Sequence, residues 1–433
     1  MRAFYAAFFV VFFYVPSASA LAATVPLKRH RFSEAFRKAN LMKRLSLNVT
    51  ADLDPLPSNY QKDGEYGIEV TIGSSGTFYL QLDTGSSDLG VASSKCFGCS
   101  KAKHLYKPSG SAMPQNCSWC DDHVTKETTL SCKTSRASPR TKMCDYEISY
   151  ADNSGYSAAL FRDEVAFDSK HRSQAYVGMI FEAKTFFDGV VDGIIGFAGR
   201  GESSANAPTP FELLVADGTV DANVFSLCLE LSGGQLYLGD IDLIHDPATQ
   251  WTTRVPGNDF YTVKVTDMLV DSQSIGIKPN VFNDGGAIID SGTSDCCVPQ
   301  PAFKALKKSF RSLCASTCLK GICNCATKKP LTSTIFENRC VDMSKEDMAL
   351  FPNITVMMDG IPIEHRPEFY LQDGQVYCDN EDMYTISYSS CGASGSGSIF
   401  GDTFMQGFVT IHDIAGGRMG FHPRRADDAC PQY

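Results

Sequence analysis

The sequence predicts a mostly β fold arranged as two lobes of similar design. Three observations predict it: short alternating stretches between Gly-rich turns, few helical stretches, and one motif that occurs twice at matched spacing. Residues 65–73 and 260–266 alternate apolar and polar side chains as half-buried strands do, and residues 78–82 form the returning strand of the first pair. Residues 287–289 form a short buried strand, and residues 303–313 form a helix.

The repeated motif reads Asp-Thr-Gly-Ser-Ser at residues 83–87 and Asp-Ser-Gly-Thr-Ser at residues 290–294. Each copy follows an apolar strand. Each is followed by a triplet of two apolar residues and a glycine, which ends at Gly196 in the first copy and Gly401 in the second. These glycines lie 113 and 111 residues after the first residue of their motifs. An ordinary turn explains either triplet alone, but not two copies at matched distance. We therefore expect two lobes, each supplying one aspartate.

The N-terminus predicts a leader. Residues 3–15 are apolar and precede a small-residue pattern that ends at Ala20, as in a secretory signal peptide; the run is too short for the alternative, a membrane anchor. We expect the signal peptide at residues 1–20, a basic pro-segment at 21–60, an N-terminal lobe at 61–245 and a C-terminal lobe at 246–433.

Charge separates the leader from the rest of the chain. The first 57 residues hold 8 basic and 3 acidic residues, and the remainder holds 31 basic and 46 acidic. The basic stretch is either a solvated leader or a pro-segment that docks electrostatically on the acidic body and leaves when carboxylates are protonated. An acidic body argues against a nucleic-acid partner. No zinc-protease or phosphate-loop motif is present, so we expect no cofactor or metal, and we expect a monomer.

Seventeen cysteines, all after residue 95, predict disulfides formed in the secretory pathway. An insert at about residues 94–144 holds six of them, and its two Cys-x-x-Cys pairs have the spacing of a zinc ribbon; disulfides are the favoured reading in a secreted chain. Asn-X-Ser/Thr sequons predict a glycoprotein. The cysteines at 314–325 look like a small stapled insertion. The odd count leaves at least one thiol free or intermolecular. One of the adjacent Cys296 and Cys297 is a candidate for it, and the alternative is that both are paired elsewhere. The cysteines of the insert are Cys96, Cys99, Cys117, Cys120, Cys132 and Cys144, and the sequons begin at Asn48, Asn116 and Asn353.

Two aspartates brought together can hydrolyse a peptide bond. Like charges in one site cannot both ionise, so Asp83 and Asp290 would hold one proton between them. The ionised member takes a proton from water, and the protonated member donates to the carbonyl oxygen. The titration belongs to the pair, so neither residue has a role of its own, and the pair works best in acid. The residues expected to support the pair are Thr84, Gly85, Ser86, Ser291, Gly292 and Thr293.

Over nearly its whole length after the leader, the chain resembles the pepsin-like aspartic proteases. The resemblance rests on the two motifs and on residues 192–197, 235–239, 399–404 and 408–413. It implies two β-barrel-like lobes with a cleft that binds an extended peptide or protein substrate, an activatable zymogen, and a disulfide between Cys340 and Cys378.

The resemblance also implies a flap, a hairpin that closes over substrate, at residues 148–155. Tyr150 would be the flap tyrosine and Asp152 a substrate-binding neighbour; the alternative for Tyr150 is a strand aromatic packed in the core. The chain departs from the family at Gly90, where a tryptophan usually braces the flap tyrosine. The insert at about residues 94–144 looks like that of the nepenthesin-like and plasmepsin V-like branches.

The function that follows is an aspartic endopeptidase outside the cell or in an acidic vacuole or lysosome-like compartment. The alternative is a secreted binding protein that keeps the cleft without catalysis. Such a protein is expected to lose an aspartate or a neighbouring glycine or threonine, and both motifs are intact here.

Overall fold

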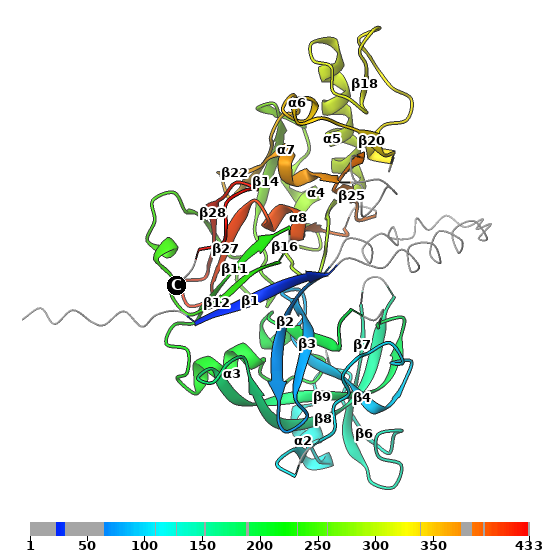
Figure 1. Ribbon diagram of the computed structural model, residues 1–433, viewed down its shortest axis with the longest axis vertical. Coiled ribbons are helices and arrows are strands. Elements are labelled where there is room, and N and C mark those ends of the chain that lie inside the picture. The colour runs from blue at the N-terminus through cyan, green and yellow to red at the C-terminus, as the bar shows by residue number, and fades with distance from the viewer. Residues whose placement is uncertain are drawn as a thin grey trace, which may run out of the picture.

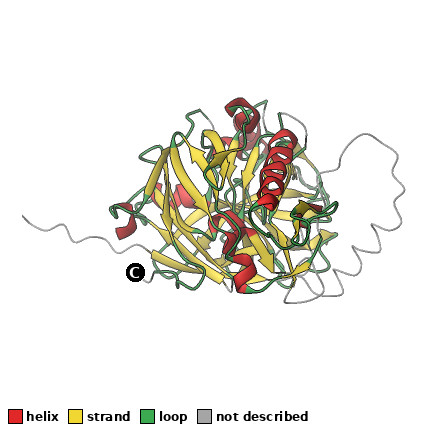
Figure 2. Ribbon diagram, turned by 90° about the horizontal axis from the view of Figure 1, so that it is seen from above, coloured by secondary structure: helices red, strands yellow, loops and turns green. Residues whose placement is uncertain are grey.

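The computed structural model describes residues 23–30, 65–108, 110–126, 128–150, 153–187, 190–231, 233–257, 259–337, 339–373, 383–392 and 395–431. Strands dominate, and two lobes lie one above the other along the long axis of the molecule (Figure 1). Short helices lie among them (Figure 2). The predicted signal peptide and most of the predicted pro-segment lie outside the described residues.

A single large sheet runs from the N-terminal lobe into the C-terminal lobe. Within the described residues it has fifteen strands. In spatial order they are β13 (Gln250–Thr253), β28 (Arg418–Pro423), β27 (Phe408–Asp413), β11 (Val224–Glu230), β12 (Gly233–Leu238), β1 (Ala23–His30), β2 (Glu65–Ile72), β3 (Thr77–Asp83), β10 (Gly193–Gly196), β4 (Leu89–Phe97), β9 (Arg172–Lys184), β8 (Gly155–Ala166), β7 (Met143–Ser149) and β6 (Ser131–Lys133), with β5 (Met113–Pro114) beside β8.

Four smaller sheets belong to the C-terminal lobe. The first is β15 (Gln273–Ser274), β14 (Val265–Val270), β21 (Ile354–Met358) and β22 (Ile361–His365), and the second is β16 (Ala287–Ile289), β26 (Ser398–Phe400), β17 (Cys296–Val298) and β25 (Tyr388–Ser390). The others are β20 (Val341–Asp342), β24 (Met383–Ile386) and β23 (Leu371–Asp373), and the hairpin of β18 (Cys323–Asn324) and β19 (Lys329–Pro330).

The described helices are short. They are α2 (Cys117–His123), α3 (Pro210–Ala216), α4 (Pro279–Asn283), α5 (Gln300–Ser312), α6 (Lys345–Met348), α7 (Pro367–Tyr370) and α8 (Asp402–Met405), with single 3₁₀ turns at Arg200–Glu202, Asp242–Ile244, Leu313–Ala315 and Ile335–Glu337. The predicted helix at 303–313 is α5. It buries Ala302, Leu306 and Phe310, a stripe at a spacing of four residues that faces the core.

Strand β1 comes from the basic stretch that the sequence assigns to the pro-segment. It pairs with β12 along most of its length and with β2 at its C-terminal end, so it lies inside the large sheet (Figure 1). Its apolar residues Ala23, Val25 and Leu27 are buried, while Lys28 on the other face forms an ion pair with Glu69. In the full chain this segment is therefore part of the core.

The predicted strand at residues 260–266 is only partly correct. The regular strand, β14, begins at Val265, and Thr262 makes only an isolated bridge to Ile288. The alternation has another cause: Tyr261 and Val263 are buried, and the Tyr261 hydroxyl donates to the Phe197 carbonyl of the other lobe at 2.5 Å. This segment therefore contacts the other lobe through Tyr261, while its backbone bonds to β16: the Val263 amide donates to the Ala287 carbonyl at 2.8 Å, and the Ile289 amide donates to the Tyr261 carbonyl at 3.1 Å.

The cysteines of the insert form disulfides, as the sequence favours over a zinc site. Seven bridges lie among the described residues, and Cys340 is also disulfide-bonded; Cys378, the partner that the resemblance implies, lies outside the described residues. The seven are Cys96–Cys99, Cys117–Cys132, Cys120–Cys144, Cys228–Cys430, Cys297–Cys391, Cys314–Cys323 and Cys318–Cys325. Cys296 is buried and free. Adjacent strand residues point to opposite faces, so only one cysteine of the adjacent pair reaches Cys391.

Candidate active site

The two motifs occupy equivalent places in the two lobes. Asp83 is the last residue of β3, and β10 runs parallel to β3 with Gly196 opposite Asp83. Asp290 directly follows β16, and β26 runs parallel to β16 with Phe400 opposite Ile289. The matched spacing in the sequence thus has a structural cause. In each lobe the apolar-apolar-Gly triplet lies against the strand that ends at the aspartate.

Both carboxylates are buried and held by their own motifs. The Gly85 amide donates to Asp83 Oδ1 at 2.7 Å, and the Ser86 hydroxyl donates to Asp83 Oδ2. The second lobe repeats this pattern on Asp290. Its Oδ1 accepts the Gly292 amide at 2.9 Å, and its Oδ2 accepts the Thr293 hydroxyl at 2.7 Å. Each turn therefore fixes the orientation of its carboxylate with one amide and one hydroxyl.

Thr84 and Ser291 join the two turns across the lobes. The Thr84 hydroxyl donates to the Ile289 carbonyl at 3.1 Å and accepts the Ser291 amide at 2.9 Å. In return, the Ser291 hydroxyl donates to the Leu82 carbonyl at 2.8 Å and accepts the Thr84 amide at 3.2 Å. All four bonds are buried. Because each hydroxyl satisfies two backbone groups of the other lobe, the two aspartates are held at a fixed separation.

The glycines after Thr84 and Ser291 leave room for the opposite carboxylate. A Cβ at Gly85 would lie 2.6 Å from Asp290 Oδ1. A Cβ at Gly292 would lie 2.2 Å from Asp83 Oδ1 and 3.2 Å from Asp290 Oδ1. Each carboxylate therefore packs against the backbone of the other lobe's turn, and any larger residue would separate the pair.

The electrostatics of the site are those of a carboxyl pair that retains a proton. Burial, followed by the neighbouring Asp290 charge, raises the pKa of Asp83 to about 8, although the hydrogen bonds from Ser86 and Gly85 lower it. A hydrogen bond between the two carboxyl groups contributes to the same rise. One proton on the pair removes the repulsion that two buried carboxylates would suffer.

Tyr150 lies at the end of the hairpin formed by β7 and β8. Its amide donates to the Ser154 carbonyl at 2.9 Å, and Asn153 has a positive φ of 66°, as at a tight hairpin tip. Its ring stacks on Phe186 at a centroid distance of 5.7 Å. Burial, and then the charges of Tyr156 and Asp83, raise the pKa of Tyr150 well above its ordinary value. Asp152 lies outside the described residues.

At Gly90 the sequence departs from the family, but the space that a larger side chain would occupy there is not empty. A Cβ there would lie 2.5 Å from the Tyr156 hydroxyl oxygen. The Tyr156 ring, which comes from the start of β8, therefore fills the space. Nothing in the sequence indicates this contact, because it joins residues far apart in the chain.

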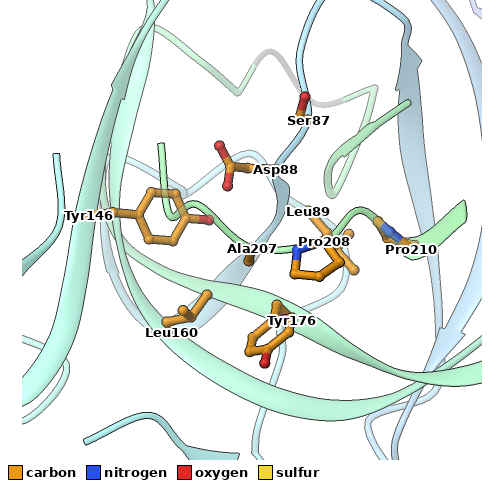
Figure 3. Close-up of a pocket in the computed structure, with 9 residues that line it drawn as sticks. All are labelled: Ser87, Asp88, Leu89, Tyr146, Leu160, Tyr176, Ala207, Pro208 and Pro210. Atoms are coloured by element: carbon orange, nitrogen blue, oxygen red, sulfur yellow. The ribbon is translucent and has the colours of Figure 1, made fainter. Parts of the chain in front are cut away.

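Asp88, a buried acid beside the site, is not predicted from the sequence. The Asp88 carboxylate accepts the Ser203 hydroxyl at 2.7 Å and the Ser204 amide at 2.8 Å, and burial raises its pKa to about 6. It lines a cavity of about 10 Å³, room for about one water molecule, and Figure 3 shows the Tyr146 ring beside it. Asp88 faces the interior behind the Asp83 turn. Its bonds tie that turn to the segment after β10.

Among the described residues, no group of three or more His, Cys, Asp or Glu side chains is arranged to hold a metal ion. Within the same part of the chain, no helix is long and apolar enough to cross a membrane.

Comparison with known proteins agrees with this geometry. A family model described as eukaryotic aspartyl protease matches residues 65–424. Cathepsin D of Dictyostelium discoideum is 25% identical over 417 residues, covering 93% of this chain and 94% of its own. An aspartyl protease family protein of Arabidopsis thaliana is 25% identical over 394 residues, covering 88% and 76%, and pepsin-2B of Gadus morhua is 24% identical over 371 residues, covering 84% and 97%. The chain belongs to the eukaryotic aspartyl protease family and has its bilobal fold. It is an aspartic-type endopeptidase, which hydrolyses peptide bonds and takes a peptide substrate.

Proposed function

We propose that Asp83 and Asp290 are the catalytic pair of this endopeptidase and that they activate one water molecule between them. The observation that carries the proposal is the two-fold arrangement of the turns, in which each carboxylate is fixed by its own motif and packs against the glycine of the other. The bound water would lie between the carboxyl groups, within reach of both.

In the proposed reaction the ionised carboxylate removes a proton from the water as its oxygen attacks the scissile carbonyl carbon. The protonated carboxyl donates its proton to the carbonyl oxygen, which gives a neutral tetrahedral intermediate. Proton transfer to the amide nitrogen then lets the carbon–nitrogen bond break, and the pair ends with one proton, as it began. No acyl-enzyme forms, since the nucleophile is water.

The supporting residues have separate proposed roles. Ser86 and Thr293 donate to the outer oxygens and orient the carboxyl groups, while Thr84 and Ser291 set the distance between the lobes. Tyr150 covers the cleft as the flap tyrosine. The pair loses activity at high pH when its shared proton leaves. Because the pKa of Asp83 is raised well above 3.8, one proton is retained well into the acidic and mildly acidic range.

We further propose the biological context that the sequence indicates. Residues 1–20 are a signal peptide, residues 21–60 a pro-segment of a zymogen, and the lobes divide near residue 245. The disulfides are those of a protein that folds in the secretory pathway. The mature enzyme is a glycosylated monomer that acts outside the cell or in an acidic vacuole or lysosome-like compartment.

Hydrolysis of a mixed peptide library between pH 3 and 7.5 tests this proposal. The wild type, Asp83→Asn and Asp290→Asn are compared, with and without pepstatin, a transition-state mimic for the family. We expect pepstatin-sensitive cleavage by the wild type at acidic pH, and none by either variant. Cleavage that persists in both variants would overturn the proposed pair. A folded, processed wild type that cleaves no peptide would favour the binding protein.

A further inference from the structure

The flap tyrosine is surrounded by aromatic rings from its own lobe. Tyr156 lies at the start of β8, and its ring centroid is 6.3 Å from that of Tyr150, 6.1 Å from that of Tyr146 and 5.2 Å from that of Phe186. The contacts with Tyr146 and Phe186 are edge-to-face. Phe186 also stacks on Tyr150, so Tyr156 and Phe186 hold the flap ring from two directions.

The floor beneath Tyr156 is backbone only. Gly90 of β4 is paired with Ile194 of β10 and Gly178 of β9, so it lies in the middle of the sheet. A Cβ at Gly90 would lie 2.5 Å from the Tyr156 hydroxyl oxygen and 2.6 Å from the ring carbon that carries it. The Tyr156 ring is therefore seated directly on the Gly90 backbone, and it cannot keep this position beside any larger residue.

The hydroxyl groups of the cluster lie in the interior. The hydroxyl oxygens of Tyr146, Tyr150 and Tyr156 are buried, and that of Tyr156 interacts with both of the others. Burial, then the Asp88 charge, raises the pKa of Tyr156 well above its ordinary value, although hydrogen bonds with Tyr146 and Tyr150 lower it. Burial, then Tyr156 and Asp83, likewise raises the pKa of Tyr150. Both tyrosines thus stay protonated throughout the working pH range and remain available as donors.

We propose that Tyr156 is a positioning residue for the reaction: seated on Gly90, it holds the ring of Tyr150 in place over the carboxyl pair. This inference rests on the proposed function, because it acts through Tyr150. In this proposal Tyr156 contacts neither the substrate nor the carboxyl pair. Its loss leaves the chemistry of the pair intact and lets the flap adopt positions that bind peptide poorly.

Two substitutions perturb this contact from opposite sides. Tyr156→Leu removes the ring, and Gly90→Ala displaces it while leaving Tyr156 in the chain. We expect each to raise KM about tenfold, the scale of losing one or two aromatic contacts, with kcat changed less than threefold. Tyr156→Phe keeps the ring and should restore most of the loss. In the Tyr156→Leu background, Gly90→Ala should add no further effect, because the ring that it displaces is absent.

The measurement is steady-state hydrolysis of one peptide from the library, together with the melting temperature of each variant. Tyr176→Phe is the matched control, since Tyr176 lies on β9 in the same lobe with its ring against Trp119, and it should leave KM unchanged. A wild-type KM in both Tyr156→Leu and Gly90→Ala would overturn the inference, as would effects that add in the double variant. If Tyr156→Leu does not fold, Gly90→Ala decides alone. A wild type that is inactive, or activity that survives Asp83→Asn, would instead contradict the proposed function.

Discussion

Replacement of Gly292 by alanine gives the most direct structural test of how closely the two carboxylates pack. The added Cβ would lie 2.2 Å from Asp83 Oδ1, whereas a non-bonded carbon and oxygen need at least about 3.2 Å. The methyl group and the carboxylate must therefore separate by about 1 Å. The displaced atom is an oxygen of the proposed catalytic pair and is fixed by Gly85 and Ser86, so the shift falls on the proposed reacting groups themselves.

A misplacement of about 1 Å costs about 100-fold in rate, or about 2.7 kcal/mol of transition-state stabilisation. We expect kcat/KM of Gly292→Ala to fall by at least this factor, mostly in kcat. The assay is steady-state hydrolysis of a single peptide at the pH of maximal activity, with circular dichroism to confirm folding. Gly110→Ala is the matched control, because a Cβ there meets no atom within 4 Å. Gly292→Ala with activity within threefold of wild type would refute the close packing.

The remaining predictions concern stability. Thr84→Val leaves the buried Ser291 amide without its acceptor and should lower the free energy of unfolding by about 1–3 kcal/mol in urea titrations; no change would mean that the cross-lobe bonds do not hold the turns. In the uncleaved chain, Leu27→Ala should lower the free energy of unfolding by about 2–5 kcal/mol, because Leu27 is buried. Lys28→Ala should lower it by less than about 1 kcal/mol, because Lys28 is exposed. Equal effects would contradict the burial of β1. His412 stacks on Phe225, and burial lowers its pKa from 6.5 to about 3. The unfolded chain therefore takes up this proton first as the pH falls from 6.5 to 3, and stability is lost in that window by up to about 1.4 kcal/mol per pH unit. The free energy of unfolding of His412→Phe should therefore rise relative to that of the wild type as the pH drops from 7 to 4. A difference in this free energy that stays constant with pH would show that His412 does not titrate this way.

The repeat predicts that Asp83 and Asp290 lie together, and the structure brings them together because each motif encodes its own turn locally; their catalytic role stays a prediction. Asp83 and Asp290 each follow an apolar strand, and the glycine-containing turn after each aspartate fixes its own hydrogen bonds. The distance to Gly196 and Gly401 carried the remaining information, since Gly196 ends β10 and Gly401 directly follows β26, the strands that pair with β3 and β16. Short segments and one repeated spacing therefore determine how the two carboxylates are arranged.

The disulfides of the insert show what spacing alone does not determine. Cys132 and Cys144 lie directly opposite each other on β6 and β7, yet they do not bond to one another. Each bonds instead to helix α2, where Cys117 and Cys120 are one turn apart and face the hairpin. The pairing depends on where α2 packs, which the sequence does not state.

The contact between Tyr156 and Gly90 could not be predicted from the sequence for the same reason. In the sequence, Gly90 shows only that a bulky residue is missing, and Tyr156 is one of several tyrosines near the hairpin. Their proximity depends on the pairing of β4 with β9 and of β9 with β8. Nothing in the sequence singles out Asp88 either, because its bonds to Ser203 and Ser204 join segments far apart in the chain.

The central claim, that Asp83 and Asp290 act as one unit, is tested most directly by comparing kcat for Asp83→Asn, Asp290→Asn and the double variant on one peptide. If the two carboxyls share a proton and activate one water, each single change should remove at least about 10⁴-fold of the rate, and the double variant should be no slower than the single ones. Losses that multiply in the double variant, or a single variant that keeps more than a tenth of the wild-type rate, would contradict the shared-proton pair.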